Sequence, residues 1–360
     1  MCDIAARRLR AHRLTGKPFA SAIDAVRWLG ALQSQDYVGA KWALGQRTRA
    51  VTDAALDSLF DGGAILRTHV MRPTWHFVLP EDIRWLLELT GPRIRLGLAG
   101  RHRQLEIDDG VIGRAQAAFA AALAGGRHLT RPELGQVLHE AAIPPDGQRL
   151  PHLLMAAELD GLIVSGPRRG REFTYALLEE RAPGARRLDR AEAVAELTRR
   201  YFVSHGPAQL QDFVWWSGLT AADARTGIEL VGAALDRQVV DGRDYWFDAG
   251  ARRDGGTLPA AHLLSNFDEY TVAYRDRTAI LDPERPFERA LFSFGSILSN
   301  VITVAGRVRG AWRRTAAHGA LRLEVRLLDG LEPAEAAAVE EAGRRLGGFM
   351  DRPVELVLAR

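Results

Sequence analysis

Residues 32–37 have the sequence Leu-Gln-Ser-Gln-Asp-Tyr, in which one residue separates Gln33 from Gln35. The stretch follows an amphipathic segment that ends at Gly30. A glutamine does not titrate, so neither residue can act as a general acid or base. Each amide offers an oxygen acceptor and two N–H donors on a short arm. Two interpretations stay open: a polar turn that caps a helix, the common use of such residues, or a pair of amides that form a site.

Residues 66–78 form a second unusual stretch, Leu-Arg-Thr-His-Val-Met-Arg-Pro-Thr-Trp-His-Phe-Val. The pattern predicts two short strands, which meet at Pro73. The density of arginine, histidine and tryptophan predicts that the hairpin and the glutamines form one site. Its candidate functional residues are Arg67, His69, Arg72 and His76. For the histidines a structural role inside the hairpin is the alternative, because histidine is often partly buried.

Together the two stretches resemble the bacterial winged-helix family that includes the AlkZ-like alkylpurine DNA glycosylases. The resemblance runs over most of the chain and includes residues 264–270 and 274–277. In those enzymes two glutamines flank one small or aliphatic residue and are the catalytic pair, which implies catalytic roles for Gln33 and Gln35. Ser34, between them, is more polar than the usual residue. A branch that acts on interstrand crosslinks has aspartate in the second position, so this chain is more similar to the AlkZ-like branch.

The composition is that of a soluble globular protein, with 47% hydrophobic and 26% charged residues among 360. The net charge is only +3, but arginine far outnumbers lysine. The planar guanidinium binds two acceptors at once, which suits phosphates and base edges. GC-rich codons are the alternative explanation of the arginine content. A modest net charge is therefore compatible with a local basic face.

The cellular setting is predicted from what the sequence lacks. Cys2 is the single cysteine, so no intrachain disulfide forms and a reducing compartment is expected. The sequence has no secretory signal and no apolar run of about 18 residues. We expect a cytoplasmic, nucleoid-associated protein that binds duplex DNA, with no membrane association and no protein partner implied. The histidines lack metal-ligand spacing, so no metal site and no cofactor are expected.

The element pattern predicts an α+β fold, with tandem winged-helix domains followed by a small β-rich C-terminal domain. In each of the first three domains, helices with capping signals precede a hairpin. The predicted helices span 1–12, 21–29, 52–60, 130–139, 150–159, 190–202, 207–217 and 220–235, and the hairpins 65–78, 162–177 and 239–247. Further strands at 301–312, 321–327 and 354–358 surround a helix at 333–346. The predicted domains are 1–100, 111–180, 189–250 and 260–360.

Two basic loops are candidates for contact with the phosphate backbone. The tip of the second hairpin carries Arg168, Arg169 and Arg171, and the C-terminal hairpin carries Arg313, Arg314 and His318. The family resemblance implies that a hairpin of the second kind lies beside the active site. A solvated charged loop is the alternative for both.

Two further clusters have structural interpretations. We expect Asp268, Glu269 and Asp276 to form an ion-pair network with Arg275 and Arg277, which is a common use of such clusters. An acidic catalytic base is the competing role. Trp215 and Trp216 are expected in the core, since aromatic side chains dominate cores.

The residue types limit the chemistry. The family resemblance implies a monofunctional glycosylase for N7-alkylated purines, including bulky adducts, in DNA repair or in self-resistance to a genotoxic natural product. An N7-alkylguanine already carries positive charge, so its glycosidic bond is labile without a proton donor. What remains is to stabilise a cationic sugar and position one water, which amide oxygens can do. The alternative is a non-catalytic winged-helix DNA-binding protein or transcriptional regulator.

Overall fold

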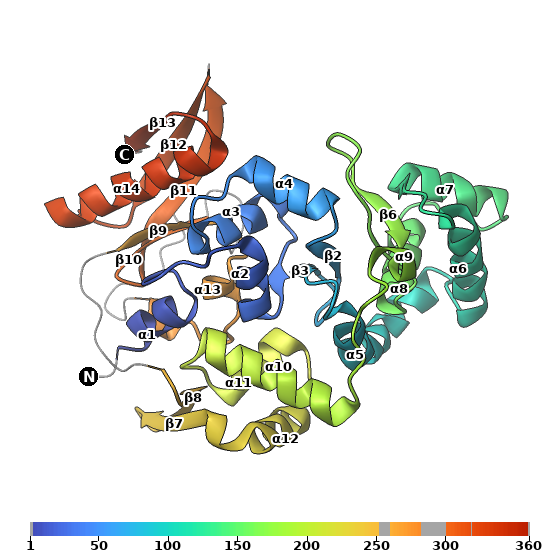
Figure 1. The fold of residues 1–360 in the computed structure, drawn as a ribbon, viewed down its shortest axis with the longest axis horizontal. Coiled ribbons are helices and arrows are strands. Elements are labelled where there is room, and N and C mark those ends of the chain that lie inside the picture. Colours follow the sequence, from blue (N-terminus) through green and yellow to red (C-terminus); the bar gives the residue numbers. More distant parts are fainter. Residues whose placement is uncertain (1–2, 252–259, 282–299, 318, 359–360) are drawn as a thin grey trace.

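The structure is a computed structural model that describes residues 3–251, 260–281, 300–317 and 319–358. Four groups of elements follow one another along the chain (Figure 1). Within the described residues no helix is both long and apolar enough to cross a membrane. His318, one of the candidate residues of the C-terminal hairpin, lies outside the described residues.

The first group surrounds the glutamine stretch. It consists of α1 (Ile4–Ala11), α2 (Ala22–Leu29), β1 (Leu32–Gln33), α3 (Tyr37–Arg47), α4 (Asp53–Asp61), β2 (Leu66–His69), β3 (Trp75–Val78) and α5 (Ile83–Gln104). The strands form an antiparallel sheet in the order β1-β3-β2. The capping signal predicted at Ser21 is confirmed, since its side chain accepts a hydrogen bond from the amide of Asp24. Thr52 caps α4 in the same way and accepts from the amide of Ala55.

Two features of this group differ from the prediction. Residues 32–33 are a strand that pairs with β3, so the interpretation of the glutamine stretch as only a capping turn was wrong. The polar end of the stretch does cap a helix, since Asp36 accepts from the amide of Gly39 at the start of α3. Helix α3 was not predicted from the sequence.

The second group has a core of its own. Its elements are α6 (Asp109–Leu123), β4 (Leu129–Thr130), α7 (Arg131–Glu140), α8 (Arg149–Leu159), β5 (Ile163–Ser165), β6 (Thr174–Leu177) and α9 (Leu178–Arg181). Thr130 and Glu133 form the predicted capping box. The sheet order is β4-β6-β5, and the buried apolar cluster around Phe119 and Leu154 draws only on residues 105–177.

The third group lies on the other side of the first. It consists of α10 (Arg190–His205), α11 (Leu210–Ser217), α12 (Ala221–Val231), the 3-10 turn η1 (Gly232–Ala234) and the hairpin β7 (Leu235–Val240) with β8 (Arg243–Asp248). Its core is continuous with that of α5. Trp216 is fully buried as expected, whereas the side chain of Trp215 is 43% exposed.

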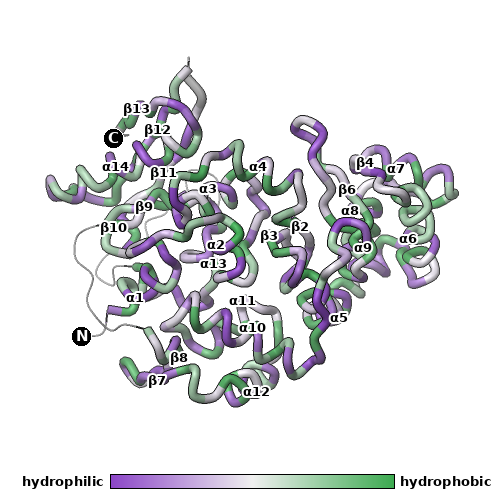
Figure 2. Tube along the Cα trace, viewed as in Figure 1, coloured by the Kyte–Doolittle hydropathy of each residue, from purple (hydrophilic) through white to green (hydrophobic). Residues whose placement is uncertain are grey.

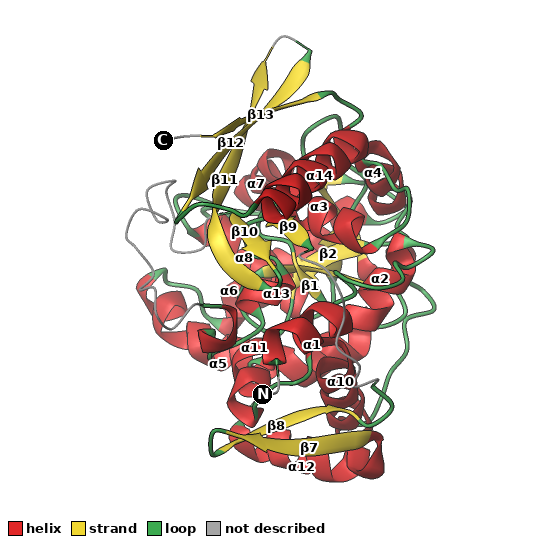
Figure 3. Ribbon diagram, turned by 90° about the vertical axis from the view of Figure 1, so that its left-hand side faces the viewer, coloured by secondary structure: helices red, strands yellow, loops and turns green. Residues whose placement is uncertain are grey.

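The C-terminal group is a five-stranded sheet with one helix on it (Figure 3). Its elements are β9 (Ala261–Leu264), α13 (Glu269–Val272), the 3-10 turn η2 (Thr278–Ile280), β10 (Val301–Val304), β11 (Arg307–Ala317), β12 (Ala320–Leu327), α14 (Pro333–Met350) and β13 (Val354–Leu358), in the sheet order β13-β12-β11-β10-β9. Its apolar face is not a separate core: Trp312 and Phe349 belong to the same buried cluster as Leu32 and Trp42.

The mixed helix and strand content confirms the predicted α+β class. The winged-helix arrangement and the four domain boundaries stay predictions. Figure 2 shows apolar and polar segments alternating along the chain, as expected when each element buries one face. The shared core of the first and fourth groups brings residues from both ends of the chain to the glutamines.

Candidate functional site

The two glutamines lie in different environments, Gln33 at the end of β1 and Gln35 two residues beyond it. Gln33 pairs across the sheet with His76 and is only 6% exposed, whereas Gln35 is exposed. The amide of Ser34 donates to the carbonyl of Trp75 at 2.7 Å, and the amide of Trp75 donates to Oε1 of Gln35 at 3.4 Å. The hairpin therefore fixes the glutamine stretch, as the sequence predicted when it placed both in one site.

Arg72 contacts Gln33 directly. Its Nη2 donates to Oε1 of Gln33 at 3.0 Å, and its guanidinium carbon lies 5.6 Å from the ring centroid of Trp215. Burial lowers the pKa of Arg72, and the nearby carboxylate of Glu269 opposes that shift. Arg72 remains a cation at neutral pH, so it orients the Gln33 amide and places positive charge beside it.

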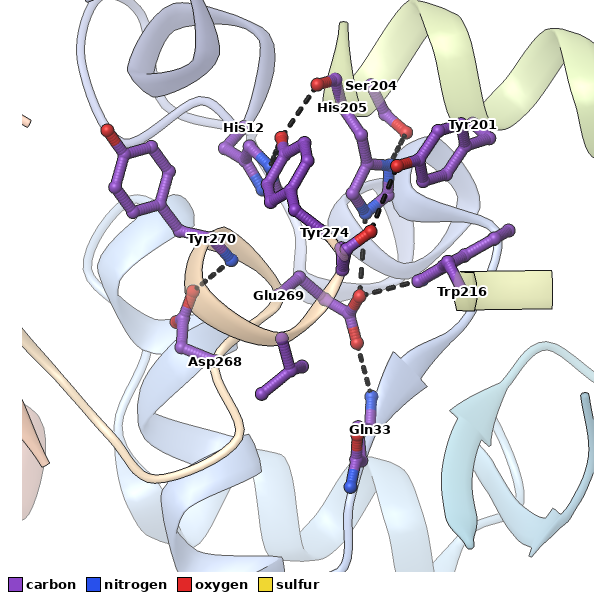
Figure 4. Close-up of polar contacts among 12 residues, drawn as sticks. His12, Gln33, Tyr201, Ser204, His205, Trp216, Asp268, Glu269, Tyr270 and Tyr274 are labelled. Atoms are coloured by element: carbon purple, nitrogen blue, oxygen red, sulfur yellow. Dashed lines mark hydrogen bonds and ion pairs between the residues drawn. The ribbon is translucent and has the colours of Figure 1, made fainter. Parts of the chain in front are cut away.

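Glu269 binds the backbone of Gln33 (Figure 4). Its Oε1 accepts from the backbone amide of Gln33 at 2.7 Å, and its Oε2 accepts from Nε1 of Trp216 at 2.8 Å. The side chain is completely buried. Burial alone would raise the pKa of Glu269, but His205 and the Gln33 amide hold that pKa below its usual value. Glu269 therefore stays ionised, and its negative charge lies against the backbone of Gln33.

Aromatic and histidine side chains enclose Glu269 away from water. Nε2 of His205 lies 3.5 Å from Oε2 of Glu269, and the His205 ring stacks on Tyr201 with centroids 4.8 Å apart. Burial lowers the pKa of His205. Oγ of Ser204 donates to the carbonyl of Arg200 and lies 2.7 Å from Nδ1 of His205. The carboxylate therefore acts in a medium of low polarity, where its field is little screened.

The four candidate residues of the hairpin are placed differently. Nε of Arg67 donates to the carbonyl of Ser34 at 3.1 Å. Nδ1 of His69 is 2.5 Å from Oε2 of Glu158, and the His69 ring lies 4.4 Å from that of Trp75. His76 is fully buried, with Nδ1 donating to the carbonyl of Thr74 at 2.9 Å.

The protonation state of His76 follows from its surroundings. Burial, with a contribution from the Arg72 cation, lowers the pKa of His76 to about 4. The ring is therefore neutral near pH 7. Because Nδ1 donates to a carbonyl, Nε2 is a bare acceptor, and it has no hydrogen-bond partner in the described part of the chain.

The basic loops are only partly available to DNA. Arg168 is bound in ion pairs with Asp57 at 3.0 Å and Asp61 at 2.9 Å, so it ties the hairpin of the second group to α4. Arg169 pairs with Glu133 at 2.7 Å but stays 55% exposed. Arg171 is exposed. DNA contact through these residues stays a prediction.

The C-terminal hairpin points elsewhere. In Figures 1 and 3 the connected ends of β11 and β12 project away from the sheet that carries β1. Arg313 pairs with Glu324, and Nη1 of Arg314 contacts Sδ of Met350 at 3.6 Å. The expectation that this tip lies beside the glutamines was therefore wrong, while contact with DNA elsewhere along a duplex stays a prediction.

The acidic cluster is structural in part, but its partners differ from those expected. Asp268 pairs with Arg47 at 2.8 Å, and Asp276 pairs with Arg243. Neither Arg275 nor Arg277 forms an ion pair with these carboxylates: Arg275 contacts Gln211, and Arg277 donates to the carbonyl of Thr271. Glu269 is the member that reaches the glutamines, which the sequence alone did not reveal.

The comparisons with known proteins agree with this geometry. A family model described as "DNA glycosylase AlkZ-like" matches residues 26–349. The chain therefore belongs to the AlkZ-like family of DNA glycosylases, enzymes that hydrolyse glycosidic bonds in DNA.

A solved structure shares the fold. The Streptomyces sahachiroi DNA glycosylase AlkZ superimposes with a TM-score of 0.80 at 21% sequence identity, and the match covers 99% of this chain and 98% of that one. No curated protein sequence gave a significant match. Among the described residues, no group of three or more histidine, cysteine or acidic side chains is arranged to hold a metal ion.

Proposed function

We propose that the protein is a monofunctional glycosylase that hydrolyses the N-glycosidic bond of cationic N7-alkylated purines in duplex DNA, with Gln33 and Gln35 as its catalytic pair. Bulky adducts are its substrates, in DNA repair or in self-resistance to a genotoxic natural product. The substrate class rests on the residue types: the site offers amides and a buried carboxylate, and no side chain suited to protonate a neutral leaving base.

One observation carries the proposal. The glutamine stretch is surrounded by buried polar atoms that have no hydrogen-bond partner within the described residues: Oγ of Ser34, Nε of Arg72, Oγ1 of Thr74 and Nε2 of His76. Buried polar groups are normally satisfied, and exceptions call for an explanation. A water and a substrate sugar bound next to Gln33 and Gln35 would supply the missing partners.

The charges of the site fit a cationic transition state. As the glycosidic bond breaks, positive charge moves to the sugar. Each glutamine carbonyl oxygen already accepts one hydrogen bond from the protein and has a second lone pair to offer to that charge. Glu269 adds a full negative charge near the backbone of Gln33. Arg72 opposes this effect, so Glu269 also offsets the cation that orients Gln33. Preorganised groups of this kind are effective because they need no reorganisation during the reaction.

The neutral histidine contributes a second element. A nucleophilic water needs an acceptor to fix its orientation, and the bare Nε2 of His76 is one. With the pKa of His76 near 4, this acceptor persists across the neutral pH range. We infer that His76 and the glutamines hold one water on the sugar. DNA is held by the exposed arginines, with Arg169, Arg171, Arg313 and Arg314 as candidates alongside Arg67 and Arg72. Roles in DNA binding for His69 and His318 belong to the same proposal, whereas the ion pairs of Arg168 with Asp57 and Asp61 favour a structural role for that residue.

The direct test is incubation with a duplex that contains one N7-methylguanine, followed by alkaline cleavage of abasic sites. Release of free base together with an alkali-dependent strand break is expected. A strand break without alkali would contradict the monofunctional assignment. DNA binding without base release would favour the alternative, a non-catalytic DNA-binding protein.

A further inference from the structure

A small pocket lies beside the glutamine stretch, between the first and second groups of elements. It has a volume of about 330 Å³, and its walls include Arg67, Trp75, Arg131, Arg171, Phe173 and Tyr175. The backbone of Trp75 is hydrogen-bonded to Ser34 and Gln35. Trp75 therefore belongs both to the wall of the pocket and to the hydrogen-bonded surroundings of the proposed catalytic pair. Its size is at the lower end of the range for small-ligand sites, about 300–1,000 Å³.

The pocket contains a buried cation that no carboxylate of the described residues contacts directly. Arg67 is only 7% exposed, and its guanidinium carbon lies between the rings of Trp75, at 4.3 Å, and Phe173, at 4.7 Å. Its Nε donates to the carbonyl of Ser34. Within the described residues, no carboxylate lies within 4.0 Å of this guanidinium, and neither Nη atom has a hydrogen-bond acceptor.

Such a group is costly to bury without a partner. Burial lowers the pKa of Arg67 to about 10, so it remains a cation at neutral pH. A buried charge is normally paired and hydrogen-bonded. The rings on its two faces stabilise the cation but leave the in-plane N–H groups of its Nη atoms for an anion.

The rim of the pocket adds charge of the same sign. Arg131 and Arg171 are both exposed, and the guanidinium carbon of Arg131 lies 5.9 Å from the Trp75 ring. Glu172 is the carboxylate among the lining residues, so three arginines stand against one acid. This excess of positive charge attracts an anion with several acceptor oxygens, and guanidinium groups match phosphate in geometry.

We propose that this pocket binds a DNA backbone phosphate close to the damaged nucleotide, held by Arg67, Arg131 and Arg171. The proposal rests on the proposed function, because it identifies the anion as part of the substrate. It also links binding to catalysis. The guanidinium of Arg67 that binds the phosphate also donates a hydrogen bond to the carbonyl of Ser34, which lies between the two glutamines. The site thus aligns the glutamine stretch with the nucleotide next to the bound phosphate.

The test uses the two exposed arginines, since replacing them removes no core packing. The variants are Arg131→Gln, Arg171→Gln and the double variant. Arg344→Gln is the matched control, because Arg344 is 63% exposed on α14, remote from the pocket, and pairs only with glutamates of its own helix. Affinity for an undamaged duplex is measured over a series of salt concentrations. Losing one phosphate contact reduces the magnitude of the negative slope of log K against log salt by about 0.9.

In the double variant the magnitude of the slope should fall by up to about 0.9, because the contact with one phosphate is lost, and affinity should fall about tenfold. Each single variant should show a smaller fall in both quantities. The control should match the wild type. A slope unchanged in the double variant would overturn the proposal.

A second measurement identifies the phosphate. Duplexes with one N7-methylguanine carry a single uncharged methylphosphonate, placed in turn at each nearby position. At one position the methylphosphonate should weaken wild-type binding and have little further effect on the double variant, because both changes remove the same contact. Additive effects at every position would overturn the proposal.

Inorganic phosphate alone, tested by thermal shift, separates a free-anion site from a backbone site. Stabilisation of the wild type but not of the double variant, without the methylphosphonate effect, would assign the pocket to a free anion and refute the DNA contact. If no base is released but the slopes and the methylphosphonate scan behave as expected, the proposed function fails and the pocket stands. If base is released and the slopes do not change, only the pocket fails.

Discussion

The backbone amide of Gln33 donates a 2.7 Å hydrogen bond to Oε1 of Glu269, a residue 236 positions further along the chain. The acceptor is a fully buried carboxylate, whose second oxygen is held by Trp216. This bond joins β1 to α13 and sets the position of the first glutamine. It also places a fully buried negative charge beside the backbone of Gln33.

We predict that Glu269→Gln slows single-turnover base release about a hundredfold, the usual cost of losing one preorganised electrostatic group. Affinity for undamaged DNA should stay close to the wild-type value, because Glu269 does not reach the surface. The measurement is single-turnover release of N7-methylguanine beside a DNA titration. Asp276→Asn is the control, since Asp276 lies in the same segment but pairs with Arg243. Equal rates for Glu269→Gln and the wild type would exclude a role for the charge.

Much of the fold follows from local signals. The helices that begin at a side-chain cap, such as those after Ser21, Thr52 and Thr130, lie where the sequence predicts them, because a cap is satisfied within a few residues. Helix α3 was missed for the opposite reason. Seven of its eleven residues are buried, Lys41 and Arg47 among them, so it lacks the polar face that gives an amphipathic period.

The site was predicted in part. The glutamines contact the Arg/His/Trp hairpin although the two stretches are about 40 positions apart in the sequence. This contact was predicted because the unusual composition of both stretches indicated a shared site. The contact with Glu269 depends on how the C-terminal sheet packs on the first group, and no local pattern encodes it. Arg131 was also missed: it appeared in the sequence only as part of a capping box, and its place beside Trp75 comes from the packing of two groups.

We predict that Arg168→Gln lowers stability without reducing the salt dependence of DNA binding. Arg168 bonds to Asp61 through its backbone amide and its guanidinium, and hydrogen bonds to Asp61 raise its pKa. With Asp61 partly exposed, the expected loss is about 1 kcal/mol of unfolding free energy. Denaturant unfolding measures it, and the salt series described above measures the binding. A reduced slope would show that Arg168 contacts phosphate after all.

We predict that the protein loses stability when the pH falls from about 7 to 4. Burial lowers the pKa of His76 and of His262 to about 4, below the unfolded value of 6.5. Between those values the unfolded chain binds protons that the native chain does not, so stability rises with pH in this range. Each histidine contributes up to about 3 kcal/mol. The depressed pKa of Glu269 acts in the same direction, because its stabilisation is lost as the carboxylate is protonated.

Thermal unfolding at a series of pH values measures this effect. His139 offers a control: it is exposed, so His139→Gln should leave the pH dependence intact, whereas His262→Gln should make it shallower. Stability that did not change between pH 7 and 4 would contradict the neutral, buried state of these histidines.

The last prediction concerns the glutamines. Gln33→Ala and Gln35→Ala should each reduce single-turnover release of N7-methylguanine by about a hundredfold or more, because each removes one preorganised amide. The double variant should lose less than the sum of the two effects in free energy, since residues that act as a unit are not additive. DNA affinity should be nearly unchanged.

Gln35→Glu distinguishes electrostatic stabilisation from shape. Gln35 is exposed and its Oε1 accepts from the Trp75 amide, so a carboxylate keeps that bond and adds negative charge near the cationic sugar. It should therefore retain more activity than Gln35→Ala. Above about pH 5 the wild-type rate should be flat, because His76 stays neutral and Glu269 ionised. Wild-type rates in both alanine variants would remove the pair from catalysis and make Glu269 the first residue to reconsider.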